Sequence, residues 1–376
     1  MLVSYSRVCD RDWAPWSHTW DEVGAPTFSK GIVGDVYLLP VRAVALQHFV
    51  PHVFYLGEHP TQPLLDGAHA GFEVRVRLHL RVVAPVRGAW TVRGSWSESA
   101  TVTKVVRLTP AASGEDTVVS LALGANASDV QLWWPNQMGP QRLYNVTATF
   151  TPKGASVPTV SDTRRIGFRH ISLVTANDTD PAVVSAGGDG SASPTFTTLI
   201  RVNGARIYAR GANMVPADEL EARVTDLALR RMVASAASAN MNMIRVWGGG
   251  TYLPQSFYDA TDELGILVYH DMMYAQEGHS PCCPWYGPCW YGRCDLPEAA
   301  WNASSEVCNC DNQAGRTQRK ELQHQIRRLS HHTSIAIWDA TNEALGKDTT
   351  ISVSFIRKLL LRCDSLSIEK TPQFDQ

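Results

Sequence analysis

Hydrophobic and polar residues alternate with a period of two in the first half of the chain, from about Val41 to Phe150. The alternation is clearest at residues 72–78 and 117–123, and glycine, proline and asparagine separate the alternating runs. This spacing turns every second side chain to one face of an extended strand, so it predicts an antiparallel β-sandwich. Residues 144–150 are expected to form its last long strand, and the small polar residues of 177–193 a loop.

Beyond this loop the pattern changes to short buried runs separated by amphipathic segments. Residues 199–208 predict a hairpin with a tight Asn203-Gly204 turn. Thr225 is placed to cap the first of the helices that follow, and Gly265 to end the second. Helices are expected at 225–239, at 254–264, around 322–329 and from 353 onward, and buried strands at 243–247, 266–271 and 334–338.

Counted from Ile207, these strands and helices form four successive β/α units. Such alternation implies parallel strands joined by right-handed crossovers. A (β/α)8 barrel needs eight units and about 250 residues, so four units predict the first half of a TIM barrel. A small doubly wound domain is the alternative, but no glycine-rich phosphate loop follows the first strand. The expected fold is therefore multidomain, with a β part and an α/β part.

Polar side chains stand at the carboxyl ends of the four predicted parallel strands, where barrel enzymes place their reactive groups. Each has a structural alternative, since Arg245 and Asp271 can simply pair with each other and Asn213 can cap a turn. Taken together, the set favours a catalytic site. It consists of Asn213, Arg245 with Trp247, Asp271, and the pair Asn342-Glu343.

Glu343 is the candidate general acid/base. A retaining glycosidase uses two carboxyl groups about 5–5.5 Å apart, one of which protonates the leaving oxygen while the other attacks the anomeric carbon. The proton donor needs a raised pKa, which burial or the negative partner supplies. Glu343 follows a buried strand that ends near Trp338, and Asn342 can donate a hydrogen bond to a sugar hydroxyl.

Composition narrows the possible partners. Hydrophobic residues make up 44% and charged residues 19% of the 376 positions, as in ordinary globular proteins. A net charge of -2 without a basic run gives no reason to expect nucleic acid, and no apolar run reaches the roughly 20 residues of a membrane span. The 12 tryptophans are compatible with sugar stacking, although most of them can equally fill cores.

The cysteines and glycosylation motifs favour an oxidising compartment. Six of the 8 cysteines lie between Cys282 and Cys310, and they lack the paired spacing of zinc knuckles, so a disulfide-stapled loop is expected rather than a metal site. Residues 1–7 do not resemble a signal peptide. Asn-x-Ser/Thr motifs occur at Asn126, Asn145, Asn177 and Asn302. The cysteines and these motifs together suggest a lysosomal or secreted protein given without its leader.

Several motifs together resemble the β-mannosidases of glycoside hydrolase family 2. The segments in the α/β part are Gly211-Ala212-Asn213, residues 240–250 (NMNMIRVWGGG), 262–266 (DELGI), and 335–338 (IAIW) ending in Asn342-Glu343. Upstream, residues 132–136 (LWWPN) with Gly139 and Leu143-Tyr144 resemble the end of that family's immunoglobulin-like domain. Asp12-Trp13-Ala14-Pro15, with 31–32 and 36–38, resembles the end of its jelly-roll domain.

The resemblance implies three domains: the C-terminal remnant of a jelly-roll sugar-binding domain at 1–40, an immunoglobulin-like sandwich at 41–175, and the N-terminal half of a catalytic TIM barrel at 176–376. It makes Glu343 the proton donor, and it makes Asn342, Arg245, Asp12 and Trp13 substrate-binding residues. It implies no metal and no organic cofactor. The family's nucleophile follows the seventh barrel strand, so we expect this chain to lack it.

Three departures from the family pattern stand out. Arg11 replaces a tryptophan before Asp12, and Ala14 replaces a glycine. Asp339-Ala340-Thr341 replaces the usual Cys-Gly-Asn, and the Cys282–Cys310 insertion is not part of the common pattern.

The expected function of the parent protein is that of a retaining exo-β-glycosidase. It would hydrolyse terminal, non-reducing β-D-mannose residues of oligosaccharides or glycoprotein glycans, and this chain alone would be inactive. One alternative is a β-galactosidase or β-glucuronidase of the same family. Another is a non-catalytic carbohydrate-binding or pseudoenzyme fragment.

Overall fold

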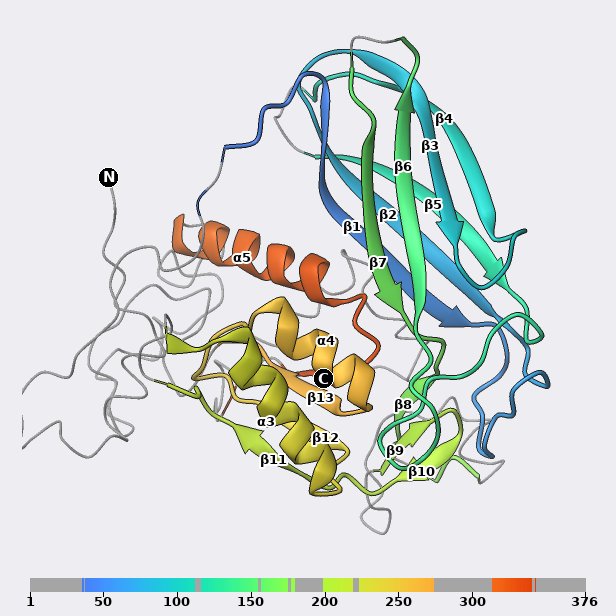
Figure 1. The fold of residues 1–376 in the computed structure, drawn as a ribbon, viewed down its shortest axis with the longest axis vertical. Helices are drawn as coiled ribbons and strands as arrows, with labels where there is room; N and C mark the ends of the chain where they lie inside the picture. Colours follow the sequence, from blue (N-terminus) through green and yellow to red (C-terminus); the bar gives the residue numbers. More distant parts are fainter. Residues whose placement is uncertain are drawn as a thin grey trace, which may run out of the picture.

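The computed structural model describes residues 36, 38–111, 116–154, 157–174, 177–179, 199–218, 223–273, 313–339 and 342, with the side chains of 313–319 excepted. Four sheets and three named helices lie within these ranges. Figure 1 shows two long antiparallel sheets on one side and a helix-covered parallel sheet on the other. The predictions for residues 1–35, for the cysteine-rich segment 282–310, for the helix from 353 and for Glu343 lie outside the described residues.

The first half of the chain forms a β-sandwich, as the period-two alternation predicts. One sheet has the order β1-β2-β5, with β1 (Val44–Tyr55), β2 (Phe72–Val82) and β5 (Thr117–Ala125). The other has the order β4-β3-β6-β7, with β3 (Val86–Gly94), β4 (Thr101–Leu108), β6 (Tyr144–Pro152) and β7 (Val160–Ile166). All pairings in both sheets are antiparallel. Their inward side chains share one core, which includes Phe72, Val74, Trp90, Val92, Leu121 and Phe150.

A small antiparallel sheet connects the sandwich to the second half. It has the order β10-β9-β8, with β8 (Ile171–Val174), β9 (Leu199–Val202) and β10 (Ala205–Ile207). The predicted Asn203-Gly204 turn is confirmed, with φ angles of 49° and 80° at its two central residues. The prediction that Ile207 begins the first β/α unit is wrong, because β10 pairs antiparallel with β9.

The second half contains a parallel sheet of order β11-β12-β13-β14. Its first strand is β11 (Gly211–Met214), followed by β12 (Met243–Val246), β13 (Leu267–Asp271) and β14 (Ile335–Asp339). The helices between these strands are α3 (Asp226–Ser238), α4 (Gln255–Leu264) and α5 (Gln313–Leu329). Both predicted helix-end signals are confirmed: the Thr225 hydroxyl accepts a hydrogen bond from Ala228 N, and Gly265 ends α4 at φ 70°.

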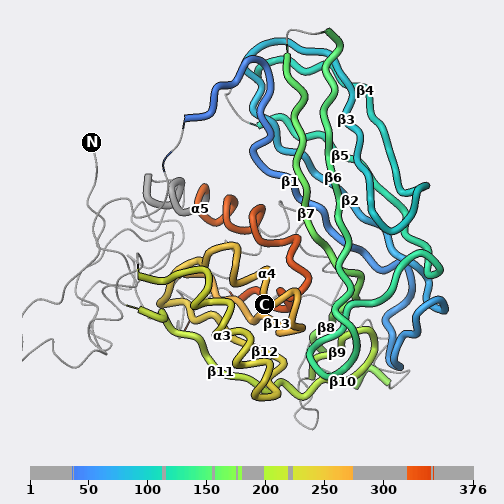
Figure 2. The backbone as a smooth tube through the Cα atoms, in the orientation of Figure 1, coloured from blue at the N-terminus to red at the C-terminus, as the bar shows by residue number. Residues whose placement is uncertain are grey.

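The two faces of the parallel sheet have different neighbours. Helices α3 and α4 cover one face, where Leu229, Val233 and Phe257 pack on Ile244, Val246 and Val268. On the other face, Met243 and Leu267 share a cluster with Trp133 and with Val202 and Ile207 of the small sheet. The backbone path in Figure 2 shows α5 lying between the sandwich and the rest of the α/β part.

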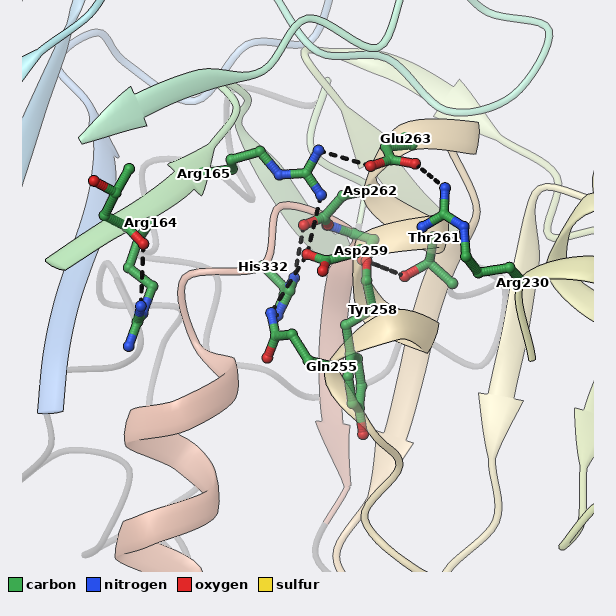
Figure 3. A network of polar contacts seen from close by, with 12 residues as sticks. Arg164, Arg165, Arg230, Gln255, Tyr258, Asp259, Thr261, Asp262, Glu263 and His332 are labelled. Atoms are coloured by element: carbon green, nitrogen blue, oxygen red, sulfur yellow. Dashed lines mark hydrogen bonds and ion pairs between the residues drawn. The ribbon is translucent and has the colours of Figure 1, made fainter. Parts of the chain in front are cut away.

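The sandwich is tied to the α/β part by buried hydrogen bonds. The indole nitrogen of Trp133 donates to the carbonyl oxygen of Asp262 at 2.8 Å. The backbone nitrogen of Asn136 donates to the carbonyl oxygen of Gly265 at 2.7 Å. Around them, Arg165 pairs with Glu263 and Asp259, as Figure 3 shows. The end of α4 is therefore tied to the sandwich side of the molecule.

Candidate active site

The candidate site is a row of polar side chains at the carboxyl ends of β11 to β14. The strand register places Asn213 beside Arg245, and Arg245 beside Tyr269. It also places Asp271 opposite Asp339. Because the carboxyl ends of parallel strands meet at one edge of the sheet, residues distant in sequence meet here.

Arg245 is the centre of this row. Its Nε and Nη2 donate to the two carboxylate oxygens of Asp271, at 3.1 and 2.6 Å. Nη2 also donates to Oδ1 of Asn342 at 2.8 Å, and Nη1 donates to Oδ1 of Asn213 at 3.2 Å. The guanidinium of Arg245 thus contacts three other predicted site residues: Asn213, Asp271 and Asn342.

Asp271 is fully buried and has a third hydrogen-bond donor. Its side chain is 0% exposed, and the backbone nitrogen of Gly248 donates to Oδ2 at 3.0 Å. Burial raises the pKa of Asp271 to about 6, against the lowering effect of Arg245, and the neighbouring Asp339 adds to the rise. At neutral pH the group is a carboxylate whose two oxygens are both occupied by donors.

The orientation of Asn342 follows from its contact with Arg245. A guanidinium has only N–H donors, so the atom of Asn342 that faces it must be the amide oxygen. The amide NH2 group is then the part of this buried side chain that can donate a hydrogen bond to another group. This is the role expected of Asn342 beside a sugar hydroxyl.

The structure adds two residues that the sequence did not single out for the site. The phenol of Tyr269 donates a hydrogen bond to Oδ2 of Asp339. Burial and the adjacent carboxylate of Asp339 raise the pKa of Tyr269, so the phenol stays protonated. Residues 269 and 271 share one face of a strand by period-two spacing, a signal that could have identified Tyr269.

A buried aromatic layer supports the other face of these strand ends. His270 Nδ1 donates to the backbone oxygen of Asp271 at 2.7 Å, because a carbonyl only accepts. Burial lowers the pKa of His270 to about 4, so the ring is neutral and its Nε2 accepts from the Tyr258 hydroxyl at 2.8 Å. The ring stacks on Tyr252 and Tyr258 and lies 5.0 Å from Trp338 between centroids.

Not all predicted site residues are described. The structure brings together Asn213, Arg245, Asp271 and Asn342. Trp247 lies directly after β12, where its backbone nitrogen bonds Met214 O. Asp12, Trp13 and Glu343 lie outside the described residues.

Within the described ranges, no group of three or more histidine, cysteine or acidic side chains is arranged to hold a metal ion. In the same part of the chain, no helix is both long and apolar enough to cross a membrane.

Comparison with known proteins indicates the class of protein that this chain resembles. The family described as "Glycosyl hydrolases family 2" matches residues 58–169, which span the sandwich from β2 to β7. Residues 58–169 are therefore similar to glycosyl hydrolase family 2.

The particular relatives within that family are β-mannosidases, so the resemblance inferred from the motifs is confirmed. The chain is 33% identical to β-mannosidase A of Aspergillus terreus over 213 residues, 57% of this chain and 19% of that protein. It is 33% identical to the β-mannosidase of Capra hircus over 230 residues (61% and 21%) and 29% identical to that of Rattus norvegicus over 330 residues (87% and 31%). The chain thus spans between a fifth and a third of the length of these relatives.

Solved structures show the same fold. A β-D-mannosidase from Dictyoglomus thermophilum aligns with a TM-score of 0.60 at 21% identity, covering 86% of this chain and 34% of that one. An exo-chitosanase from Amycolatopsis orientalis aligns with a TM-score of 0.58 at 18% identity, covering 86% and 31%. Since these two enzymes have different substrates by name, the fold does not choose the sugar.

Proposed function

We propose that the chain is part of a retaining exo-β-glycosidase that removes terminal, non-reducing β-D-mannose residues. The observation that carries this proposal is the Arg245 cluster. It gathers Asp271 and Asn213 with the residue that immediately precedes Glu343, at the sheet edge where barrel enzymes act. The identity to β-mannosidases supports mannose as the sugar.

In the proposed mechanism Glu343 is the proton donor to the leaving oxygen and then the base that activates water. Asn342, with its oxygen held by Arg245, donates from its NH2 group to the hydroxyl next to the reacting carbon. The nucleophilic carboxylate would come from a later barrel strand, as in the family. Asp12 and Trp13 would contact the sugar from the jelly-roll domain.

The proposed domain organisation follows the same resemblance. The sandwich would be the immunoglobulin-like domain of residues 41–175, and β11 to β14 would be the first four strands of a TIM barrel. The first barrel strand is then Gly211–Met214 rather than a strand beginning at Ile207. A lysosomal or secreted location and β-mannoside glycans as substrates complete the proposal.

The acid/base role of Glu343 can be tested by leaving-group dependence in a protein that includes both carboxylates. Replacing Glu343 with Gln should slow an alkyl β-mannoside, which needs protonation, far more than a dinitrophenyl β-mannoside, which does not. Equal slowing of both substrates would refute the role. Faster hydrolysis of an aryl β-galactoside than of the aryl β-mannoside would refute the choice of sugar.

We expect a protein that holds Asn342 and Arg245 in this arrangement to bind a β-mannoside. Absence of β-mannoside binding would count against Asn342 and Arg245 as a substrate-binding pair.

A further inference from the structure

The guanidinium of Arg245 also lies over an aromatic ring. Its central carbon lies 5.7 Å from the ring centroid of Tyr269, within the range of a cation–π contact. The same guanidinium donates hydrogen bonds to Asp271, Asn213 and Asn342, so Tyr269 is a fourth side chain in contact with it.

The Tyr269 ring is itself held in place. Its hydroxyl donates to Asp339 at the end of β14, and β14 is fixed beside β13 where Met272 N donates to Asp339 O at 2.8 Å. Asp339 also lies opposite Asp271 in the strand register. Arg245 therefore contacts both Asp271 and Tyr269, and these two residues are linked to each other through Asp339.

We propose that Tyr269 and Asp339 are positioning residues that set the orientation of the Arg245 guanidinium and, through it, of the Asn342 amide. The residue at 339 is one of this chain's departures from the family pattern, where a cysteine is usual. A cysteine thiol is a weak acceptor, whereas the Asp339 carboxylate accepts strongly from a phenol. The effect on sugar binding rests on the proposed function, but the effect on Arg245 does not.

Three variants separate the contributions. Tyr269→Phe keeps the ring and removes the hydroxyl, and Asp339→Ala removes the acceptor. Asp339→Asn keeps an acceptor oxygen without the charge. Tyr208→Phe is the matched control, because Tyr208 is 84% exposed and distant from the polar row.

The direct readout is exchange with water of the Arg245 Nε–H proton, followed by nitrogen–proton NMR and assigned by its loss in Arg245→Lys. We expect about tenfold faster exchange in Tyr269→Phe and in Asp339→Ala, because a less well fixed ring lets the hydrogen bond from Arg245 Nε to Asp271 open more often. A tenfold change corresponds to about 1.4 kcal/mol. The double variant should be no faster than either single one, since both act through the same contact. Asp339→Asn keeps a weaker, neutral acceptor and should give an acceleration between those of wild type and Asp339→Ala, whereas the control should stay within about twofold of wild type.

Unchanged exchange in both single variants, or effects that multiply in the double variant, would overturn the proposal. The second readout is the dissociation constant for methyl β-D-mannoside, which should rise several-fold in Tyr269→Phe and Asp339→Ala. If the wild-type chain does not bind this sugar, the proposed function fails while the exchange data still decide the positioning role. If it binds and exchange accelerates without weaker binding, the link from Arg245 to Asn342 is wrong.

Discussion

The pairing of Arg245 with Asp271 makes a quantitative prediction for Asp271→Asn. The substituted side chain would offer one oxygen and one NH2 group to donors that now bind two carboxylate oxygens. If its oxygen keeps the contacts of Oδ2, its NH2 group faces the Nε–H of Arg245, and two donors meet. The substitution therefore removes a charge pair and at least one hydrogen bond while leaving a cation beneath the site.

Breaking a buried ion pair by removing one partner costs about 3–5 kcal/mol. The Asp271 side chain is 0% exposed, but that of Arg245 is 28% exposed, so water can partly solvate the remaining charge. The raised pKa of Asp271 shows that burial of this carboxylate itself costs folding free energy, which offsets part of the loss. We therefore expect Asp271→Asn to lower the free energy of unfolding by about 1–2 kcal/mol. Urea unfolding at pH 7.5, followed by tryptophan fluorescence, measures the change.

The control is Asp162→Asn. Asp162 pairs with Arg164 at 2.8 Å in a surface contact whose side chains are 35% and 32% exposed. Pairs of this kind contribute less than about 1 kcal/mol. If Asp271→Asn destabilised the protein no more than this control, Asp271 would not be the buried support of Arg245 that we infer.

Three further outcomes are expected. Thr225→Ala should reduce stability by about 1 kcal/mol because it removes the cap of α3, and Thr225→Ser should restore most of it, measured by urea midpoint. Trp133→Phe should cost about 2 kcal/mol, since it deletes a fully buried indole and its bond to Asp262 O; wild-type stability in this variant would show that the bond does not tie the sandwich to the α/β part. Burial lowers the pKa of His52 to about 4, so its unfolded form binds the extra proton and stability should fall as pH drops from about 6.5 to 4. Melting temperatures of wild type and His52→Leu across that range should differ in slope, and equal slopes would refute the assignment.

The strands β2 and β5 of the sandwich were predictable because each has one buried face. In β2, Phe72, Val74, Val76 and Leu78 are all 0% exposed and occur at every second position, so the sequence records the burial directly. The ends of α3 and α4 were predictable for a similar reason. The cap of Thr225 and the positive φ of Gly265 are local requirements that few residue types satisfy.

The first parallel strand was misplaced because its signal is not local. Residues 211–213 of β11 are exposed, and only Met214 is buried, so no hydrophobic period marks the strand. Its identity depends on pairing with β12, about thirty positions away. Ile207 satisfied the pattern better, although it belongs to an antiparallel hairpin.

The candidate site was also predictable only in part. Position at a strand end was enough to select Asn213, Arg245, Asp271 and Asn342, which do meet. It could not show that Arg245 is their common partner, since that depends on the register of three strands. Asp339 was visible only as an unusual residue, and its contact with Tyr269 spans 70 positions.

The contacts of Arg245 limit what this side chain can recognise. A guanidinium carries five N–H bonds, and the described contacts use four of them: one on Nε, two on Nη2 and one on Nη1. Among the described residues, no acceptor is seen for the fifth N–H. Lysine, with three donors on a single nitrogen, cannot reproduce these four fixed directions. Arg245 thus contributes at most one hydrogen bond to a ligand, and discrimination between sugars that differ in one hydroxyl has to come from the residues it holds in place.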